Sequence, residues 1–325
     1  MEIRELANEI IKGRRLTRED DLRWMITCDL KQLCGAADSI REHFKGNHVD
    51  LCSIVNGKSG RCSEDCRYCA QSAWNHTGCE EYSFLGEDEI FALAKSNQEA
   101  GVNRFAIVTS GRALKGEDFE KALSAVRKMK ADLNIGLCAS MGYLTLEQFQ
   151  RLKEAGVTNY HDNLETSRAY FPKICTTHTW EGKVMTLKSA MNAGMTVCSG
   201  GIIGMGESWE DRIDLALSLA ELGIASIPLN VLMPIKGTPF EDKKVLSDDE
   251  ICRTTAVFRF INPEAHIRMA GGRRAMKNAG MRAFMSGASA AITGDMLTTT
   301  ASTVRADREM LGSIGLDTTP AWSLQ

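Results

Sequence analysis

The 325-residue sequence is poor in proline and has no excess of charge of one sign. Its six prolines form no proline- or serine-rich linker, so we expect no linker that separates independent domains. The 39 basic and 42 acidic residues are interspersed and give a net charge of −3. Because no basic patch stands out, a nucleic-acid partner is not expected.

The sequence also lacks long hydrophobic runs. None reaches the length that crosses a bilayer, and the charged, amphipathic first residues do not resemble a signal peptide. We therefore expect a cytoplasmic protein without a membrane partner. In a reducing compartment the eleven cysteines stay reduced, and their odd number in a long chain argues against a disulfide framework. Cys28, Cys34, Cys52 and Cys252 lie in apolar segments and are interpreted as small buried hydrophobic residues.

The order of apolar and amphipathic segments predicts an α/β fold. Residues 1–45 are expected to form an N-terminal helical extension, and residues 46–325 one barrel domain. Amphipathic helices are predicted near 87–100, 117–129, 145–155, 180–193, 208–222, 247–260 and 274–283. Strands are predicted at 51–55, 104–109, 134–139, 158–163, 196–201, 226–232, 266–270 and 288–292. This alternation favours a (β/α)8 TIM barrel over an open doubly wound sheet, with the site at the carboxyl ends of the strands.

The sharpest motif follows the first predicted strand. Cys62, Cys66 and Cys69 have the spacing C-x3-C-x2-C, which lets three thiolates face one inorganic cluster. A structural zinc ion normally has four protein ligands, whereas three cysteines leave one metal open for a cofactor or substrate. The alternative is a zinc knuckle completed by His76.

With Tyr68 directly before the last cysteine, this motif resembles the signature of the radical S-adenosylmethionine superfamily. The resemblance implies a 4Fe-4S cluster whose open iron chelates S-adenosylmethionine. One electron then cleaves the cofactor and yields a 5′-deoxyadenosyl radical. From about residue 50 to 315 the chain resembles the biotin synthase family in particular, through the segments 62–72, 160–167, 197–202, 236–239 and 267–273 together with Asn230.

Biotin synthases use a second cluster inside the barrel, held by three cysteines and an arginine. Cys138, Cys198 and Arg268 match that set, but the third cysteine position is occupied by Ala106, which cannot bind iron. We expect Cys175, in the loop after the fourth strand, to replace it. Three cysteines favour a four-iron cluster with an extra sulfide over a two-iron cluster. In the alternative, Cys175 is a structural thiol and Arg268 pairs with a carboxylate or donates to a cluster sulfide.

The same resemblance assigns the contacts of S-adenosylmethionine. Asn163 bridges the cofactor and the substrate, Glu165 accepts hydrogen bonds from the ribose hydroxyls, and Lys183 binds the methionine carboxylate. The catalytic residues are then Asn163 and Arg268. The adenosine is expected to lie against Tyr68, Gly200, Gly201 and Ile202.

The implied reaction is sulfur insertion into dethiobiotin to give biotin. Asn230 matches the asparagine that binds the ureido ring, His161 stands where the family usually has another asparagine, and Thr298 and Thr299 match residues that hold the carboxylate tail. The resemblance also implies a one-electron donor such as flavodoxin or ferredoxin, and a homodimer.

Two other functions compete with this one. The first is another enzyme of the same branch, of the hydrogenase-maturation or methylornithine-synthase type. The second is a non-catalytic iron–sulfur or zinc module. The joint presence of Cys138, Cys198, Asn230 and Arg268 favours biotin synthase over the first, and a non-catalytic module would not need polar residues at eight strand ends.

Overall fold

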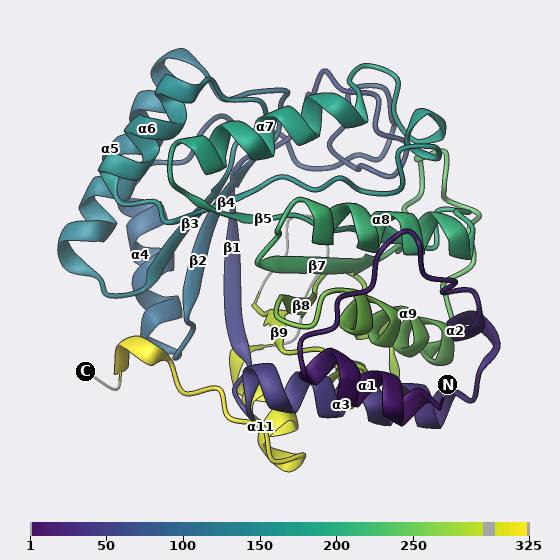
Figure 1. Cartoon of the computed structure of the whole chain (residues 1–325). Helices are drawn as coiled ribbons and strands as arrows, with labels where there is room; N and C mark the ends of the chain where they lie inside the picture. Colours follow the sequence, from purple (N-terminus) through teal and green to yellow (C-terminus); the bar gives the residue numbers. More distant parts are fainter. Residues whose placement is uncertain (1, 295–302, 324–325) are drawn as a thin grey trace.

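A closed ring of parallel strands forms the centre of the computed structural model, which describes residues 2–294 and 303–323 (Figure 1). The ring closes because β1 pairs with both β2 and β9, and because β5 pairs with β7 on the opposite side. In ring order the strands are β1 (Asp50–Lys58), β2 (Arg104–Thr109), β3 (Gly136–Ser140), β4 (Asn159–His161), β5 (Thr196–Cys198), β7 (Ser226–Val231), β8 (His266–Met269) and β9 (Ala290–Ile292). This confirms the predicted TIM-type barrel.

The fifth strand of the ring is interrupted. The predicted strand 196–201 is divided into β5 and β6 (Gly201–Ile203), and β6 pairs with β7. At the break, the Ser199 hydroxyl accepts a hydrogen bond from the amide of Leu164. The next residue, Gly200, lies so close to β7 that a Cβ there would be 1.9 Å from the carbonyl oxygen of Pro228. The interruption therefore lets the chain pass tightly over its neighbours.

Helices cover the outside of the ring, as the alternation of segments predicts. They are α4 (Glu87–Glu99), α5 (Gly116–Asp132), α6 (Leu146–Ala155), α7 (Trp180–Asn192), α8 (Trp209–Glu221) and α9 (Asp248–Ile261). Several begin at a residue whose side chain accepts a hydrogen bond from the first turn, such as Thr145 before α6 and Ser208 before α8. Their buried apolar faces pack on the sheet and form the main core.

One predicted helix is wrong. Residues 274–283 form the short turns η2 (Arg273–Ala275) and η3 (Lys277–Gly280), followed by α10 (Met281–Phe284). Asn278 and Ala279 have φ angles of 49° and 51°, in the left-handed region that a continuous helix excludes. After β9 the described chain resumes before α11 (Val304–Ser313) and ends with η4 (Ala321–Ser323).

The N-terminal helices pack on one side of the barrel. They are α1 (Ile3–Ile11), α2 (Trp24–Thr27) and α3 (Leu30–Lys45), and α3 contacts both α1 and α9 (Figure 1). The remaining 3-10 turn, η1 (Phe171–Lys173), lies in the loop after β4. Within the described ranges, no helix has the length and apolarity that a membrane span requires.

Candidate active site

A cavity of about 450 Å³ extends from the barrel interior to the loops that follow the strands. It brings together most of the residues that the sequence singles out, namely Tyr68, Cys69, Cys138, His161, Asn163, Glu165, Cys198, Ile202, Asn230 and Arg268. Cys62, Cys66, Cys175, Lys183, Gly200 and Gly201 are not among the lining residues. Thr298 and Thr299 lie outside the described residues.

The cysteine loop after β1 is tightly folded. The amide of Cys62 donates to the Gln71 oxygen at 3.0 Å, and the amide of Cys69 donates to the Cys66 oxygen at 3.1 Å. The Asn75 side chain donates to the main-chain oxygens of Cys66 and Cys69, at 3.2 and 2.8 Å. These bonds bend the loop so that the Cys69 thiol lies near both the Cys62 and the Cys66 thiols. Burial, together with the nearby Cys62 thiol, raises the pKa of Cys69 to about 11.

The three thiols of this loop are better suited to bind an iron–sulfur cluster than to form a disulfide. No disulfide joins them; the contact with Cys175 raises the pKa of Cys66 and burial raises that of Cys69, so ionising these two thiols carries a penalty. Iron removes that penalty, because metal binding releases the thiol protons and neutralises the thiolate charges.

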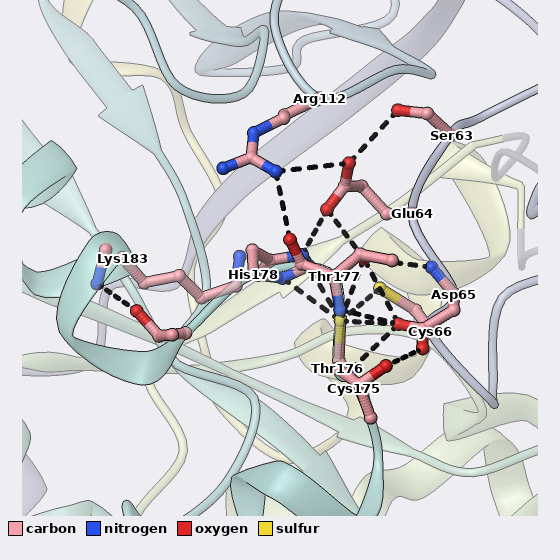
Figure 2. Close-up of polar contacts among 12 residues, drawn as sticks. Ser63, Glu64, Asp65, Cys66, Arg112, Cys175, Thr176, Thr177, His178 and Lys183 are labelled. Atoms are coloured by element: carbon pink, nitrogen blue, oxygen red, sulfur yellow. Dashed lines mark hydrogen bonds and ion pairs between the residues drawn. The ribbon is translucent and has the colours of Figure 1, made fainter.

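Acidic residues between the cysteines fix this loop to the loop that follows β4 (Figure 2). Asp65 accepts hydrogen bonds from the amides of Thr176 and Thr177, at 2.8 and 3.1 Å. Glu64 accepts from the Thr177 hydroxyl at 2.8 Å and lies 2.6 Å from Nδ1 of buried His178. The cysteine loop is therefore held in place against the barrel.

Cys175 belongs to this network and not to the barrel cavity. Its sulfur lies 3.8 Å from Sγ of Cys66 and 3.1 Å from Oδ1 of Asp65 (Figure 2). Among the described residues, Cys66, Cys175 and His178 form the group whose ligand atoms could hold one metal ion. The structure thus differs from the expectation that Cys175 joins Cys138 and Cys198, because its loop is turned toward the cysteine loop by the contacts with Asp65.

Glu165 is a buried carboxylate with spare hydrogen-bonding capacity. Its backbone lies in the left-handed region with φ of 69°. Burial raises the pKa of Glu165, and its Oε2 has no hydrogen-bond partner among the described residues. Its main chain is bonded to the segment around β5 and β6, with its amide 3.0 Å from the Gly200 oxygen and its carbonyl oxygen 2.9 Å from the Ile202 amide. An unpartnered acceptor held this rigidly is suited to receive hydroxyl groups of a ligand.

Lys183 lies apart from the cavity wall. Its Nζ is 2.7 Å from Oδ1 of Asp162, and both side chains are buried. The ammonium is also near the ring of Tyr143, 5.7 Å from its centroid. The structure therefore pairs Lys183 with a carboxylate of the protein, whereas the sequence predicts that it binds a cofactor carboxylate.

Two asparagines line the cavity in fixed orientations. Asn163 accepts a hydrogen bond from the amide of Gly200 at 3.0 Å. Asn230 donates to the Gly201 oxygen at 3.2 Å and accepts from the amide of Gly271 at 2.9 Å. Each amide keeps further donors or lone pairs for a ligand. Gly200 and Gly201 themselves serve close packing, since a Cβ at Gly201 would lie 2.3 Å from the Glu165 oxygen.

The floor of the cavity contains thiols and an ion pair. Cys138 and Cys198 line it together with Arg268, which is paired with Asp50. Sequence reasoning missed Asp50 and Cys52, which lie on the same floor. The alternation of side chains along β1 could have placed Cys52 on the inner face, but only the register between strands reveals its height in the barrel.

Two family models together match most of the chain. Residues 58–219 match the radical SAM superfamily, and residues 228–317 match the biotin and thiamin synthesis associated domain. The chain is 56% identical over 315 residues to a biotin synthase of Alkaliphilus metalliredigens, which covers 97% of this chain and 99% of that protein. It is 55% identical over 311 residues to a biotin synthase of Clostridium beijerinckii, covering 96% of this chain and 98% of that protein.

Solved structures with a similar fold are much more distant in sequence. Methylornithine synthase has a TM-score of 0.83 at 20% identity, covering 97% of each chain. The FeFe-hydrogenase maturase HydG from Carboxydothermus hydrogenoformans has a TM-score of 0.77 at 17% identity, covering 97% of this chain and 78% of that chain. At such identities the likeness shows the fold alone.

Proposed function

Since the chain belongs to the biotin synthase family of radical S-adenosylmethionine enzymes, we infer that it inserts sulfur into dethiobiotin and so forms biotin. The observation that carries this function is the identity of 56% to a biotin synthase along nearly the whole of both chains. The cavity supports it, because Cys138, Cys198, Asn230 and Arg268 all line one space.

We propose that Cys62, Cys66 and Cys69 hold the 4Fe-4S cluster. When bound, this cluster supplies the electron that cleaves S-adenosylmethionine. The protein's part is to keep the loop folded and fixed, which the Asn75 and Asp65 hydrogen bonds do. An external donor such as flavodoxin or ferredoxin is proposed as the source of the electron.

Glu165 and Asn163 are proposed to bind S-adenosylmethionine. The unpartnered Oε2 of Glu165 is placed to accept hydrogen bonds from the ribose hydroxyls. Asn163 uses its oxygen on Gly200, so its amide hydrogens remain for the ligand. Tyr68 and Ile202, which pack in one apolar cluster, provide a surface for the adenine, with the backbone at Gly200 and Gly201 behind them. The methionine carboxylate is then proposed to bind elsewhere than Lys183, which Asp162 occupies.

Dethiobiotin is proposed to bind between this pocket and the floor. Asn230 has one amide hydrogen and one lone pair beyond its bonds to Gly201 and Gly271, which suits a cyclic urea. His161 lines the same cavity, and burial lowers its pKa to about 4, so it faces the substrate as a neutral ring. The proposed contacts of the carboxylate tail with Thr298 and Thr299 lie outside the described residues.

A second iron–sulfur cluster on the floor is proposed as the sulfur source, in the four-iron form with an additional sulfide. Cys138 and Cys198 are its proposed ligands. A cytoplasmic location and a homodimer are also proposed, from the resemblance to the family.

The function is tested by one anaerobic assay. The reconstituted protein is incubated with S-adenosylmethionine, a low-potential reductant and dethiobiotin, and the products are analysed by mass spectrometry. Biotin together with 5′-deoxyadenosine is the expected result. Formation of 5′-deoxyadenosine without biotin contradicts it and favours another enzyme of the branch, whereas neither product favours a non-catalytic module. A chain with Cys62→Ala, Cys66→Ala and Cys69→Ala is the negative control.

A further inference from the structure

Cys52 on β1 lies at the same height in the barrel as Cys138 on β3. A (β/α)8 barrel closes with a shear of about eight residues, so equal height is displaced by about one residue per strand from the hydrogen-bonded register. The register runs from Ile54 through Ala106 to Cys138. Two residues back along β1 is Cys52, and its side chain packs with those of Ala106 and Cys138 in one buried cluster.

The same geometry extends this layer around the ring. Cys138 is joined through β4 to Thr196, and two residues further along β5 is Cys198. Cys198 is joined through β7 to His266, and two residues further along β8 is Arg268. Barrels of this class fill their interior with layers of four side chains from alternate strands. Here one such layer consists of Cys52, Cys138, Cys198 and Arg268, and all four line the cavity.

Arg268 is already committed to the protein. It donates to the main-chain oxygens of Asp50 and Ala291, both at 3.0 Å, and to the Ser226 hydroxyl at 3.3 Å. It also pairs with the Asp50 carboxylate. These bonds engage four of its five N–H groups. Arg268 is thus a fixed cation beside the three thiols, with one N–H left, and it is poorly placed to become a metal ligand.

Cys52, in contrast, makes few polar contacts among the described residues apart from that with the Cys138 thiol. Its thiol donates a long hydrogen bond, 3.5 Å, to the main-chain oxygen of the next residue, Ser53. It lies within reach of the Cys138 thiol, and the small Ala106 between them leaves space in front of both. A cation nearby and three sulfurs around one space are what an anionic iron–sulfur cluster requires.

We infer that Cys52, Cys138 and Cys198 are the three cysteine ligands of the second cluster. Cys52 on β1 then replaces the family's third cysteine, whose position on β2 is occupied by Ala106. This rests on the proposed function for the existence of a second cluster. It assigns Arg268 to hydrogen bonding and charge neutralisation instead of ligation. It also removes Cys175 from the ligand set.

The test isolates the second site. In a chain with Cys62→Ala, Cys66→Ala and Cys69→Ala, reconstituted iron and sulfide belong to the remaining thiols. Cys52→Ala is added to that background and compared with Cys138→Ala and with Cys252→Ala, a buried thiol on α9 away from the cavity. Iron and sulfide are counted per chain, and the cluster is recorded by Mössbauer spectroscopy.

The background and its Cys252→Ala variant are expected to hold about four irons per chain, and Cys52→Ala and Cys138→Ala at least about tenfold less. Retention of the background iron and spectrum in Cys52→Ala overturns the inference, and so does a background without iron. Cys52→Ser in the otherwise native chain guards against misfolding. It should keep the spectrum of the first cluster and lose that of the second.

The biotin assay is judged separately. If the native chain forms biotin while Cys52→Ala keeps its second cluster, the ligand assignment is wrong and the function stands. If the native chain forms no biotin but Cys52→Ala loses the iron, the ligand assignment stands and the function is wrong.

Discussion

The guanidinium of Arg268 on β8 and the carboxylate of Asp50 on β1 form an ion pair inside the barrel. The two side chains are only 5% and 9% exposed, so water screens neither charge well. Asp50 is also 3.3 Å from Nε of Arg104, and its carboxylate is therefore shared by two cations. Removal of one partner from a buried pair leaves an uncompensated charge.

Asp50→Asn should therefore lower the free energy of unfolding by about 3 kcal/mol. Urea unfolding of the variant and the native chain measures the difference. Glu264→Gln breaks an exposed pair with Arg15 and is the matched control, with an expected loss of about 0.5 kcal/mol. Equal losses in the two variants would show that the Asp50 pair is no more important than a surface pair.

Gly200→Ala should destabilise the barrel by about 3 kcal/mol, because the new Cβ would be 1.9 Å from the Pro228 oxygen and backbone must move. Gly35→Ala is the control. Gly35 lies within α3 with no atom within 4 Å of a new Cβ, so alanine there should raise stability by about 1 kcal/mol. Thermal unfolding compares them, and a Gly200 variant as stable as the native chain would contradict the close approach to β7.

The strands and most helices could be predicted because their signals are local. Apolar runs of strand length alternate with helices that begin at capping residues such as Thr145 and Ser208, and these features act within a few residues. The exceptions also have local causes that a pattern does not reveal. Asn278 and Ala279 adopt left-handed conformations, which are uncommon for residues other than glycine.

The site was predicted less completely, because its geometry depends on register and on loop contacts. Cys52 lies in an apolar segment and Cys175 in a polar loop, and the sequence favours Cys175 because that loop follows a strand. The tilt of the strands brings Cys52 level with Cys138, while the hydrogen bonds of Asp65 hold Cys175 beside Cys66. The ion pair of Lys183 with Asp162 is hidden for a similar reason, since nothing local in the sequence shows that Asp162 turns toward it.

Thr177→Val should loosen the cysteine loop. The hydroxyl of Thr177 accepts from the amide of Asp65 at 3.1 Å and donates to Glu64 at 2.8 Å, and valine keeps the shape but loses both bonds. The free energy of unfolding should fall by about 1–3 kcal/mol, because buried polar groups are left without a partner. The rate at which a chelator removes iron from the first cluster should rise. Thr176→Val is the control: it removes a more exposed hydroxyl bond to the same Asp65 and should raise the rate of iron removal less. A faster loss of iron from the Thr176 variant than from the Thr177 variant would refute the role of Thr177.

His161 should make the stability of the chain depend on pH between about 6.5 and 4. It faces the cavity inside the barrel, where burial lowers its pKa to about 4 from the ordinary 6.5. Below pH 6.5 the unfolded chain binds a proton at this position while the folded chain does not. The free energy of unfolding therefore decreases as the pH is lowered, until the folded ring is also protonated.

For the native chain, the part of this loss that comes from His161 should be about 1 kcal/mol between pH 7.5 and 5.5, allowing for water in the cavity. His161→Gln cannot titrate and should lack that part, so the difference in unfolding free energy between the two chains should change by the same amount. Urea unfolding at the two pH values, with both chains prepared without iron so that acid loss of a cluster does not contribute, measures it. A difference that stays constant with pH would mean that His161 keeps its ordinary pKa and reaches bulk water, and that the floor of the barrel is more open than its packing indicates.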